Sequence, residues 1–152
     1  MMKKVFYGIL AIMAVTACTG NKVYDTYNHT PISGWEKNDT LIFDVPAMAK
    51  SGSYQEFLGL RINGAYPFIG LTLIIEQTKY PQNLTQIDTV NCQLINKNGT
   101  YKGQGVASIQ YKLPVSILQL EKGDSLHICI RHDMKREILP GISEIGIECI
   151  RK

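Results

Sequence analysis

The sequence predicts an all-β protein, an antiparallel β-sandwich of about seven to eight strands that follows an N-terminal tether. Short apolar or alternating runs recur along the chain after residue 40, and Gly, Pro, Asn and Asp, which set turns, separate them. No run follows the helical period, so nothing supplies the crossover helices that parallel strands need. We therefore expect two antiparallel sheets packed face to face, with a closed barrel as the alternative.

Seven runs have the length of a strand. In the run 125–131, for example, Leu126, Ile128 and Ile130 share one face, whereas His127 and Arg131 share the other. Such alternation is typical of antiparallel sheets with one buried face. The predicted strands cover residues 41–45, 54–62, 71–76, 86–95, 106–113, 125–131 and 144–150.

The connections between these runs contain recognisable turn residues. The stretch from Asn96 to Gly99 ends in the Asn-Gly pair of a hairpin turn, and Glu121 to Asp124 is a second tight turn. Residues 46–53 could hold one short helical turn. Residues 18–39 are polar and rich in turn residues, so we expect a tether that joins the fold partway along and a sandwich over residues 40–152.

The first 17 residues have the layout of an export signal. Lys3 and Lys4 precede an apolar stretch over residues 5–15, which is shorter than the about 20 residues that span a bilayer. Val15, Thr16 and Ala17 then lead to Cys18, a pattern that resembles the bacterial lipobox. We expect cleavage before Cys18 and attachment of acyl chains such as palmitate to it; a plain signal peptide with an incidental cysteine is the alternative.

The residues after Cys18 bear on where the anchored chain resides. No acidic residue follows the cysteine directly and no acidic cluster lies nearby, which favours the periplasm-facing side of the outer membrane. Without residues 1–17 the chain keeps 14 of its 16 Lys and Arg residues against 13 Asp and Glu residues. This near-neutral balance gives no indication of a nucleic-acid partner.

Three cysteines remain in the mature domain, so at most one disulfide can form within it. Cys129 and Cys149 could pair if the last two strands were neighbours. Strand alternation, however, groups Cys149 with apolar residues and Cys129 with His127 and Arg131. We favour buried free thiols at Cys92 and Cys149.

No residue cluster in the sequence carries the signature of an enzyme or of a bound cofactor. His127, Cys129 and His132 are zinc-ligand types, but His132 falls on the opposite face of the strand, so we expect no metal. No GxSxG nucleophile elbow occurs. The carboxylates Glu56, Glu76 and Glu148 have no spacing that singles them out as a catalytic pair.

Tyr66, Pro67 and Phe68 form the remaining distinctive cluster. Their rings could line a binding surface, but we favour a turn whose rings cover the end of the core. Together with His132 and Asp133, these residues form the candidate interaction surface of the sequence.

Three segments together resemble the gliding-motility lipoproteins of the GldH type from Bacteroidetes. Residues 66–71 are similar to the Tyr-Pro-Phe-x-Asn-Leu segment of that family, with Gly70 at the Asn position. Residues 98–105 are similar to its Gly-x-Trp-x-Gly-x-Gly segment, with Tyr101 at the Trp position. Residues 131–136, 139–142 and 145–147 are similar to its His-x-Met-Arg, Leu-x-Gly-Ile and Val-Gly-Ile run.

The resemblance implies a non-enzymatic lipoprotein, accessory to the gliding motility or type IX secretion machinery, and it brings no catalytic residues. The expected partners are the membrane, reached through the lipid on Cys18, and other envelope lipoproteins or outer-membrane proteins. A periplasmic glycan- or ligand-binding module is the alternative, and it would present exposed aromatic rings on one sheet face or in one loop cluster.

Overall fold

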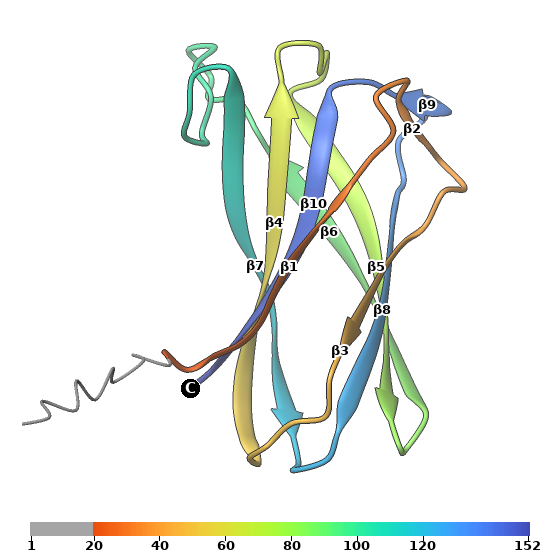
Figure 1. The fold of residues 1–152 in the computed structure, drawn as a ribbon. Helices are drawn as coiled ribbons and strands as arrows, with labels where there is room; N and C mark the ends of the chain where they lie inside the picture. The colour runs from red at the N-terminus through yellow and green to blue at the C-terminus, as the bar shows by residue number, and fades with distance from the viewer. Residues whose placement is uncertain (1–19) are drawn as a thin grey trace, which may run out of the picture.

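In the computed structural model, which describes residues 20–152, two four-stranded antiparallel sheets face each other (Figure 1). The first has the order β1-β10-β4-β7, with β1 Lys22–His29, β10 Ile142–Arg151, β4 Gly52–Asn63 and β7 Ser108–Leu120. The second has the order β3-β8-β5-β6, with β3 Leu41–Val45, β8 Ser125–His132, β5 Gly70–Tyr80 and β6 Leu84–Gln93. Two short strands, β2 Trp35–Glu36 and β9 Ile138–Leu139, pair at one end. The predicted antiparallel sandwich is confirmed.

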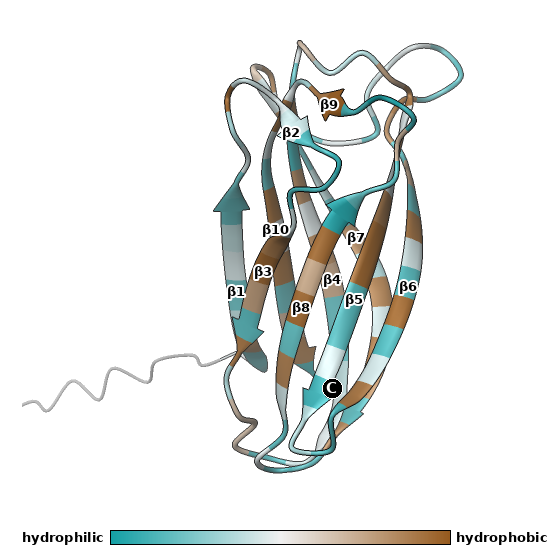
Figure 2. Cartoon of the chain, turned by 90° about the vertical axis from the view of Figure 1, so that its right-hand side faces the viewer, coloured by the Kyte–Doolittle hydropathy of each residue, from teal (hydrophilic) through white to brown (hydrophobic). Residues whose placement is uncertain are grey.

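The core fills the space between the two sheets. Leu58 and Leu60 of β4 face it from one sheet, and Leu73, Ile128 and Ile130 face it from the other, all fully buried. Apolar and polar bands alternate along β5, β6 and β8 in Figure 2, as the period-two pattern requires. Each such side chain contributes about 1.5–3 kcal/mol to folding, so this alternation fixes which face of each strand points inward.

The chain joins the fold earlier than the predicted tether of residues 18–39 allows. β1 pairs with β10 from Lys22 to His29, and Trp35 of β2 is fully buried. As an edge strand, β1 exposes most of its side chains, so its sequence lacks the apolar alternation that marks the inner strands. The export signal of residues 1–17 and Cys18 lie outside the described residues.

Two further expectations are corrected. β7 continues to Leu120 rather than ending at Leu113, because Pro114 lies on an edge strand, where a missing N–H is tolerated. Residues 46–51 form no helical turn; Met48 is instead buried, and its N–H donates to the carbonyl of Asp124 (N···O 2.8 Å). Among residues 20–152, no helix is long and apolar enough to cross a membrane.

The three cysteines of the described chain are free thiols. Cys92 and Cys149 are buried, as predicted, and burial raises the pKa of each thiol to about 12. Cys129 lies on β8 and Cys149 on β10, strands that belong to different sheets and are not neighbours. The alternative of a Cys129–Cys149 disulfide is therefore wrong.

Candidate interaction surface

The structure brings together the two segments that the sequence singles out. The stretch from Tyr66 to Phe68 precedes β5, and Asp133 follows β8, the neighbour of β5 in the sheet. The N–H of Asp133 donates to the carbonyl of Thr72 (N···O 2.9 Å), and the N–H of Thr72 points to the sulfur of Met134 (N···S 3.4 Å). Phe68 and Met134 also line one hollow beside Thr72, so the two segments meet near the start of β5.

A mostly apolar hollow of about 600 Å³ opens at this meeting point. We call it the apical hollow and define it by its lining residues, which are Phe68, Ile69, Gly70, Leu71, Thr72, Asn91, Cys92, Gln93 and Met134. The side chain of Ile69 is 71% exposed. Gly70 has no side chain to fill the hollow, and there is little room for one, because a Cβ there would lie 3.3 Å from the carbonyl oxygen of Cys92. The arrangement can receive an apolar side chain of a partner.

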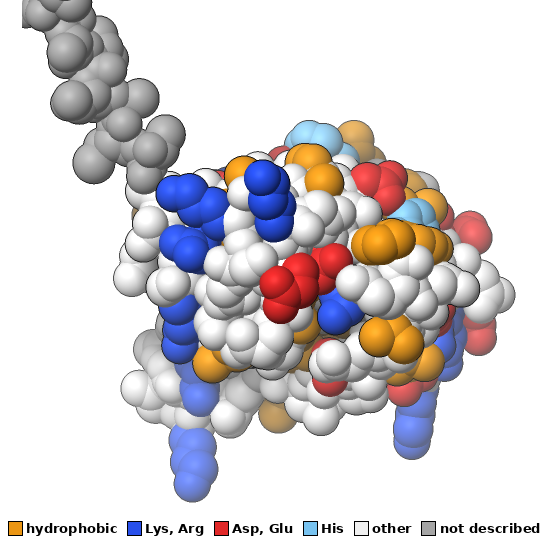
Figure 3. All heavy atoms as spheres, turned by 90° about the horizontal axis from the view of Figure 1, so that it is seen from below, with side chains coloured by type: hydrophobic (Ala, Val, Ile, Leu, Met, Phe, Trp, Pro, Cys, Tyr) orange, Lys and Arg blue, Asp and Glu red, His pale blue; other side chains and the backbone are white. Residues whose placement is uncertain are grey.

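The apical hollow lies at the end of the sandwich away from the point where the described chain begins. In Figure 1, the described chain begins towards the lower end, whereas β5 starts and β8 finishes at the upper end. At the lower end, basic side chains gather on one side (Figure 3). Lys22, Lys50 and Arg151 line a shallow hollow there together with Gly20.

Tyr66 and Phe68 mainly support the wall of the apical hollow. Tyr66 is buried and its hydroxyl donates to the carbonyl of Gly70 (O···O 2.6 Å). Burial, followed by the nearby Cys92, raises the pKa of Tyr66 well above its usual value, so the hydroxyl remains a donor. The half-buried Phe68 meets the Tyr66 ring edge to face, with centroids 5.8 Å apart. Tyr66 and Phe68 therefore belong to a turn that covers the end of the core, and they do not form an exposed aromatic pair.

His132 is not on the surface, which corrects its place in the candidate interaction surface. It is 1% exposed, and its ring meets Trp35 edge to face with centroids 5.3 Å apart. Its Nε2–H donates to the carbonyl of Trp35 (N···O 3.0 Å), and its Nδ1 accepts from the N–H of Met134 (3.3 Å). Burial lowers the pKa of His132, in keeping with a neutral ring that holds the end of β8 under β2. Asp133 is exposed, as a surface role requires.

Gly141 ties the final connection to the Tyr66 turn. Its φ of 82° lies in the left-handed region, which favours glycine. A Cβ at Gly141 would lie 2.1 Å from the backbone nitrogen of Tyr66, so no larger residue fits. The N–H of Asn63 donates to the Gly141 carbonyl (2.8 Å). The Leu-x-Gly-Ile and Tyr-Pro-Phe segments of the sequence are therefore packed on each other.

His127 and Cys129 lie on the outer face of β8, away from His132. Nδ1 of His127 is 2.6 Å from an oxygen of Asp44, and its Nε2 is 3.5 Å from the sulfur of Cys129. His132 lies on the buried face of the same strand, as the alternation predicted. Residues 20–152 contain no group of three or more His, Cys, Asp or Glu side chains placed to hold a metal ion.

Aromatic rings on the outer face of the other sheet are covered by cations. The Tyr27 ring lies against Gly59 and Gly146, and the guanidinium of Arg61 is 4.2 Å from its centroid. The ammonium of Lys112 is 4.4 Å from the centroid of the Phe57 ring. Sugar stacking needs a free ring face, so this sheet face gives the glycan-binding alternative little support.

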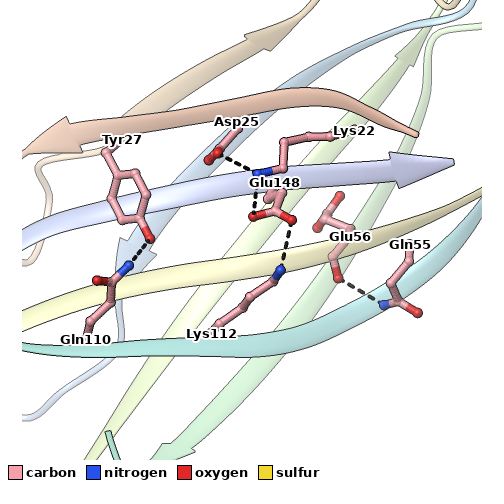
Figure 4. A network of polar contacts seen from close by, with 8 residues as sticks. All are labelled: Lys22, Asp25, Tyr27, Gln55, Glu56, Gln110, Lys112 and Glu148. Carbon is pink, nitrogen blue, oxygen red and sulfur yellow. Dashed lines mark hydrogen bonds and ion pairs between the residues drawn. The ribbon is translucent and has the colours of Figure 1, made fainter. Parts of the chain in front are cut away.

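The cations of this face belong to a network of ion pairs (Figure 4). Lys22 and Lys112 both approach the carboxylate of Glu148, with N···O distances of 3.7 and 2.9 Å. Lys22 also pairs with Asp25 at 3.1 Å. The hydroxyl of Tyr27 accepts from the side-chain amide of Gln110 at 3.4 Å. The charges of this face largely satisfy one another.

A buried polar group lies between the sheets. Glu56 is fully buried, and one of its oxygens accepts from the amide of Gln77 (N···O 3.0 Å). The other oxygen has no hydrogen-bond partner within the described chain, nor does the hydroxyl of Ser116, its cross-strand neighbour. Burial, with a smaller contribution from Asp88, raises the pKa of Glu56 to about 8, although the Gln77 hydrogen bond opposes this. The carboxyl is therefore mostly neutral at pH 7.

The burial of Glu56 was not predicted from the sequence, although a signal was present. Glu56 has the same parity in its strand as Tyr54, Leu58, Leu60 and Ile62, which are buried. The other two carboxylates considered above lie on two different outer faces, Glu76 on β5 and Glu148 on β10. No two of these three carboxylates therefore lie together as a catalytic pair.

Comparison with known proteins gives consistent matches over nearly the whole chain. The family model for the GldH lipoprotein matches residues 22–149. The chain is 31% identical over 95% of its length to "Gliding motility lipoprotein GldH" from Flavobacterium johnsoniae and covers 94% of that protein. It is 26% identical over 93% of its length to "Gliding motility lipoprotein GldH homolog" from Christiangramia forsetii, of which it covers 91%.

Proposed function

The chain belongs to the GldH lipoprotein family, and from this premise we propose that it is a non-enzymatic outer-membrane lipoprotein, accessory to an envelope complex. The complex is that of the gliding motility or type IX secretion machinery. The relatives of this chain are named gliding motility lipoproteins, which supports a general role in gliding motility. The finer assignment draws on the lipobox and on the apical hollow.

The proposed anchor is a lipid on Cys18. Val15, Thr16 and Ala17 before it have the lipobox pattern, and several acyl chains on one residue give stable anchoring. Gly20 begins the described chain beside Lys22, Lys50 and Arg151, so a basic end of the sandwich would lie next to the membrane. The absence of an acidic residue after Cys18 favours the periplasm-facing leaflet of the outer membrane.

The apical hollow is the observation that carries the proposed interaction role. It is apolar and open, and it lies at the start of β5, whereas the described chain begins near the other end of the sandwich. An anchored chain would therefore present it away from the membrane, where another envelope lipoprotein or an outer-membrane protein can bind. The exposed Ile69 can serve as an apolar anchor at the rim of the hollow, and the hollow itself can receive an apolar side chain of the partner.

Substitution of Ile69 tests this role. We expect Ile69→Asp to reduce recovery of the envelope partners in a crosslinked pull-down at least about ten-fold, because a carboxylate cannot be desolvated in an apolar contact. Ile117→Asp, at another exposed isoleucine on the far edge strand β7, is the matched control and should leave recovery unchanged. Equal recovery for both variants, with a cell that still glides or secretes, would remove the apical hollow from the proposal.

A further inference from the structure

Four strands form the edges of the two four-stranded sheets, and three of them have features that hinder pairing with another strand. β7 carries Pro114 and an irregular register opposite β4. β1 has a register shift after Lys22. β3 has five residues, and the side-chain amide of Asn28 already binds the carbonyl of Ile42 (N···O 2.7 Å). Each of these features disfavours a regular ladder with a further strand.

The fourth edge, β6, has none of these protections. It pairs with β5 from Leu84 to Gln93 without a register shift, and its ten residues include no Pro, Lys or Arg. It is the outermost strand of its sheet in Figure 2. Leu84 and Ile87 are 60% and 62% exposed on it. A long, regular and partly apolar edge is a template for strand addition.

The backbone groups that β6 leaves free can be identified from its pairing. The N–H of Leu94 donates to the carbonyl of Ile69 (2.9 Å), in register with the β5–β6 ladder. Because hydrogen-bonded positions alternate in an antiparallel pair, the backbone groups of Thr85, Ile87 and Thr89 point away from β5. These three residues therefore offer donors and acceptors to an added strand.

The sequence of β6 is nearly palindromic about Ile87, because residues at equal distances on its two sides have similar side chains. The sequence from residue 84 to 90 is Leu-Thr-Gln-Ile-Asp-Thr-Val. In an antiparallel pair of two such strands centred on Ile87, every residue meets one of matching chemistry. Ile87 meets Ile87, Gln86 meets Asp88, Thr85 meets Thr89, and Leu84 meets Val90.

We propose that a second copy of this chain binds β6, as an antiparallel strand related by a two-fold axis at Ile87. The three outward-pointing positions give about six backbone hydrogen bonds across the axis. Gln86 already donates to Asp88 within one chain (N···O 2.8 Å), and in the pair the same groups face each other across the strands. The only charge in the segment is that of Asp88, so no like charges meet.

This contact goes beyond the proposed function and leaves the apical hollow free. The hollow uses Asn91, Cys92 and Gln93 of β6, which lie outside the paired segment 84–90. The dimer joins two four-stranded sheets into one continuous sheet and places one hollow on each side of the axis. A second copy and a different partner can therefore bind at the same time.

Cysteine crosslinking of the full chain in the membranes of cells that produce it tests the pairing and its register. In a Cys129→Ser background, Ile87→Cys should form a disulfide-linked dimer, because facing Cα atoms in a hydrogen-bonded pair are about 5.5 Å apart. Thr85→Cys alone should form none, because the two copies of residue 85 lie about 13 Å apart. Thr85→Cys and Thr89→Cys chains produced together should crosslink with each other.

The same experiment contains the outcomes that overturn the proposal. The proposal is overturned if Ile87→Cys forms no dimer, or if Thr85→Cys forms a dimer as abundant as the mixed one. It is also overturned if Ile87→Cys crosslinks to a different polypeptide. A second measurement avoids cysteine. In detergent, Ile87→Lys should lower the dimer fraction at least about ten-fold, since two lysines then meet at the axis, whereas the control Ile42→Lys on β3 should not. Thermal melts of both variants check that they fold.

Discussion

Replacing Glu56 by Gln should remove most of the pH dependence of stability that the core creates. In the folded chain the Glu56 carboxyl is fully buried, with one oxygen bound to Gln77 and the other without a partner in the described chain. Asp88 adds a negative charge nearby. A glutamine in place of Glu56 would keep the shape and the Gln77 contact but could not ionise, so Glu56→Gln isolates the effect of the charge.

The magnitude follows from the difference between the folded and unfolded pKa values. The pKa of Glu56 rises from 4.5 to about 8, and one pKa unit corresponds to about 1.36 kcal/mol. The folded state thus holds the proton more tightly, and stability falls as pH rises between these two values. The loss reaches about 5 kcal/mol above pH 8, a large share of the 5–15 kcal/mol typical of a domain.

Urea unfolding of residues 20–152 at several pH values provides the assay. At about pH 4, the free energy of unfolding of Glu56→Gln should lie within about 1 kcal/mol of that of the parent chain, because both carry a neutral side chain. At about pH 9 the variant should be the more stable by up to about 5 kcal/mol. Glu76→Gln, at an exposed position, is the control and should run parallel to the parent chain.

Parallel pH profiles for the parent chain and Glu56→Gln would refute this reasoning. They would mean that the Glu56 carboxyl has nearly the same pKa in the folded and unfolded states. Water or a rearranged core would then have to solvate it, contrary to its burial between Gln77 and Ser116.

Four further predictions follow from residues described above. Cys18→Ala should move the chain from the membrane pellet to the soluble fraction, and a variant that still sediments with the membranes would reveal another anchor. Ile147→Ala should cost about 2–5 kcal/mol in thermal or urea unfolding, because Ile147 is 1% exposed in the core. His132→Ala should lower the free energy of unfolding by about 2–4 kcal/mol, since it loses the Trp35 contact and leaves buried backbone groups unpaired. Asp133→Ala should change it by no more than about 1 kcal/mol. Equal melting temperatures for the two variants would contradict the burial of His132. Gly141→Ala should cost at least about 2 kcal/mol in the same assay, and a neutral effect would contradict the close approach to Tyr66.

The burial of His132 changes the interpretation of the segment that follows β8. Taken as a surface residue, His132 would belong to the interaction surface, and its loss would affect binding alone. In the fold it connects β8 with Trp35, so its loss should weaken the wall of the apical hollow before any contact with a partner is considered. The exposed residues of the hollow, Ile69 above all, are therefore better sites for separating binding from folding.

The sequence by itself determined the fold class, the inward face of most strands and the family. Alternation is a local property, so residues such as Leu126 and Ile128 indicate their buried face without knowledge of the neighbouring strands. Only the tertiary structure decided the features that depend on contacts between distant segments, because a local sequence pattern does not contain them. β1 is a strand only because β10 lies beside it, His132 is buried only because Trp35, 97 positions away, covers it, and the pKa of Glu56 depends on desolvation between two sheets. In each case the deciding free energy comes from a contact between segments that are distant in the sequence.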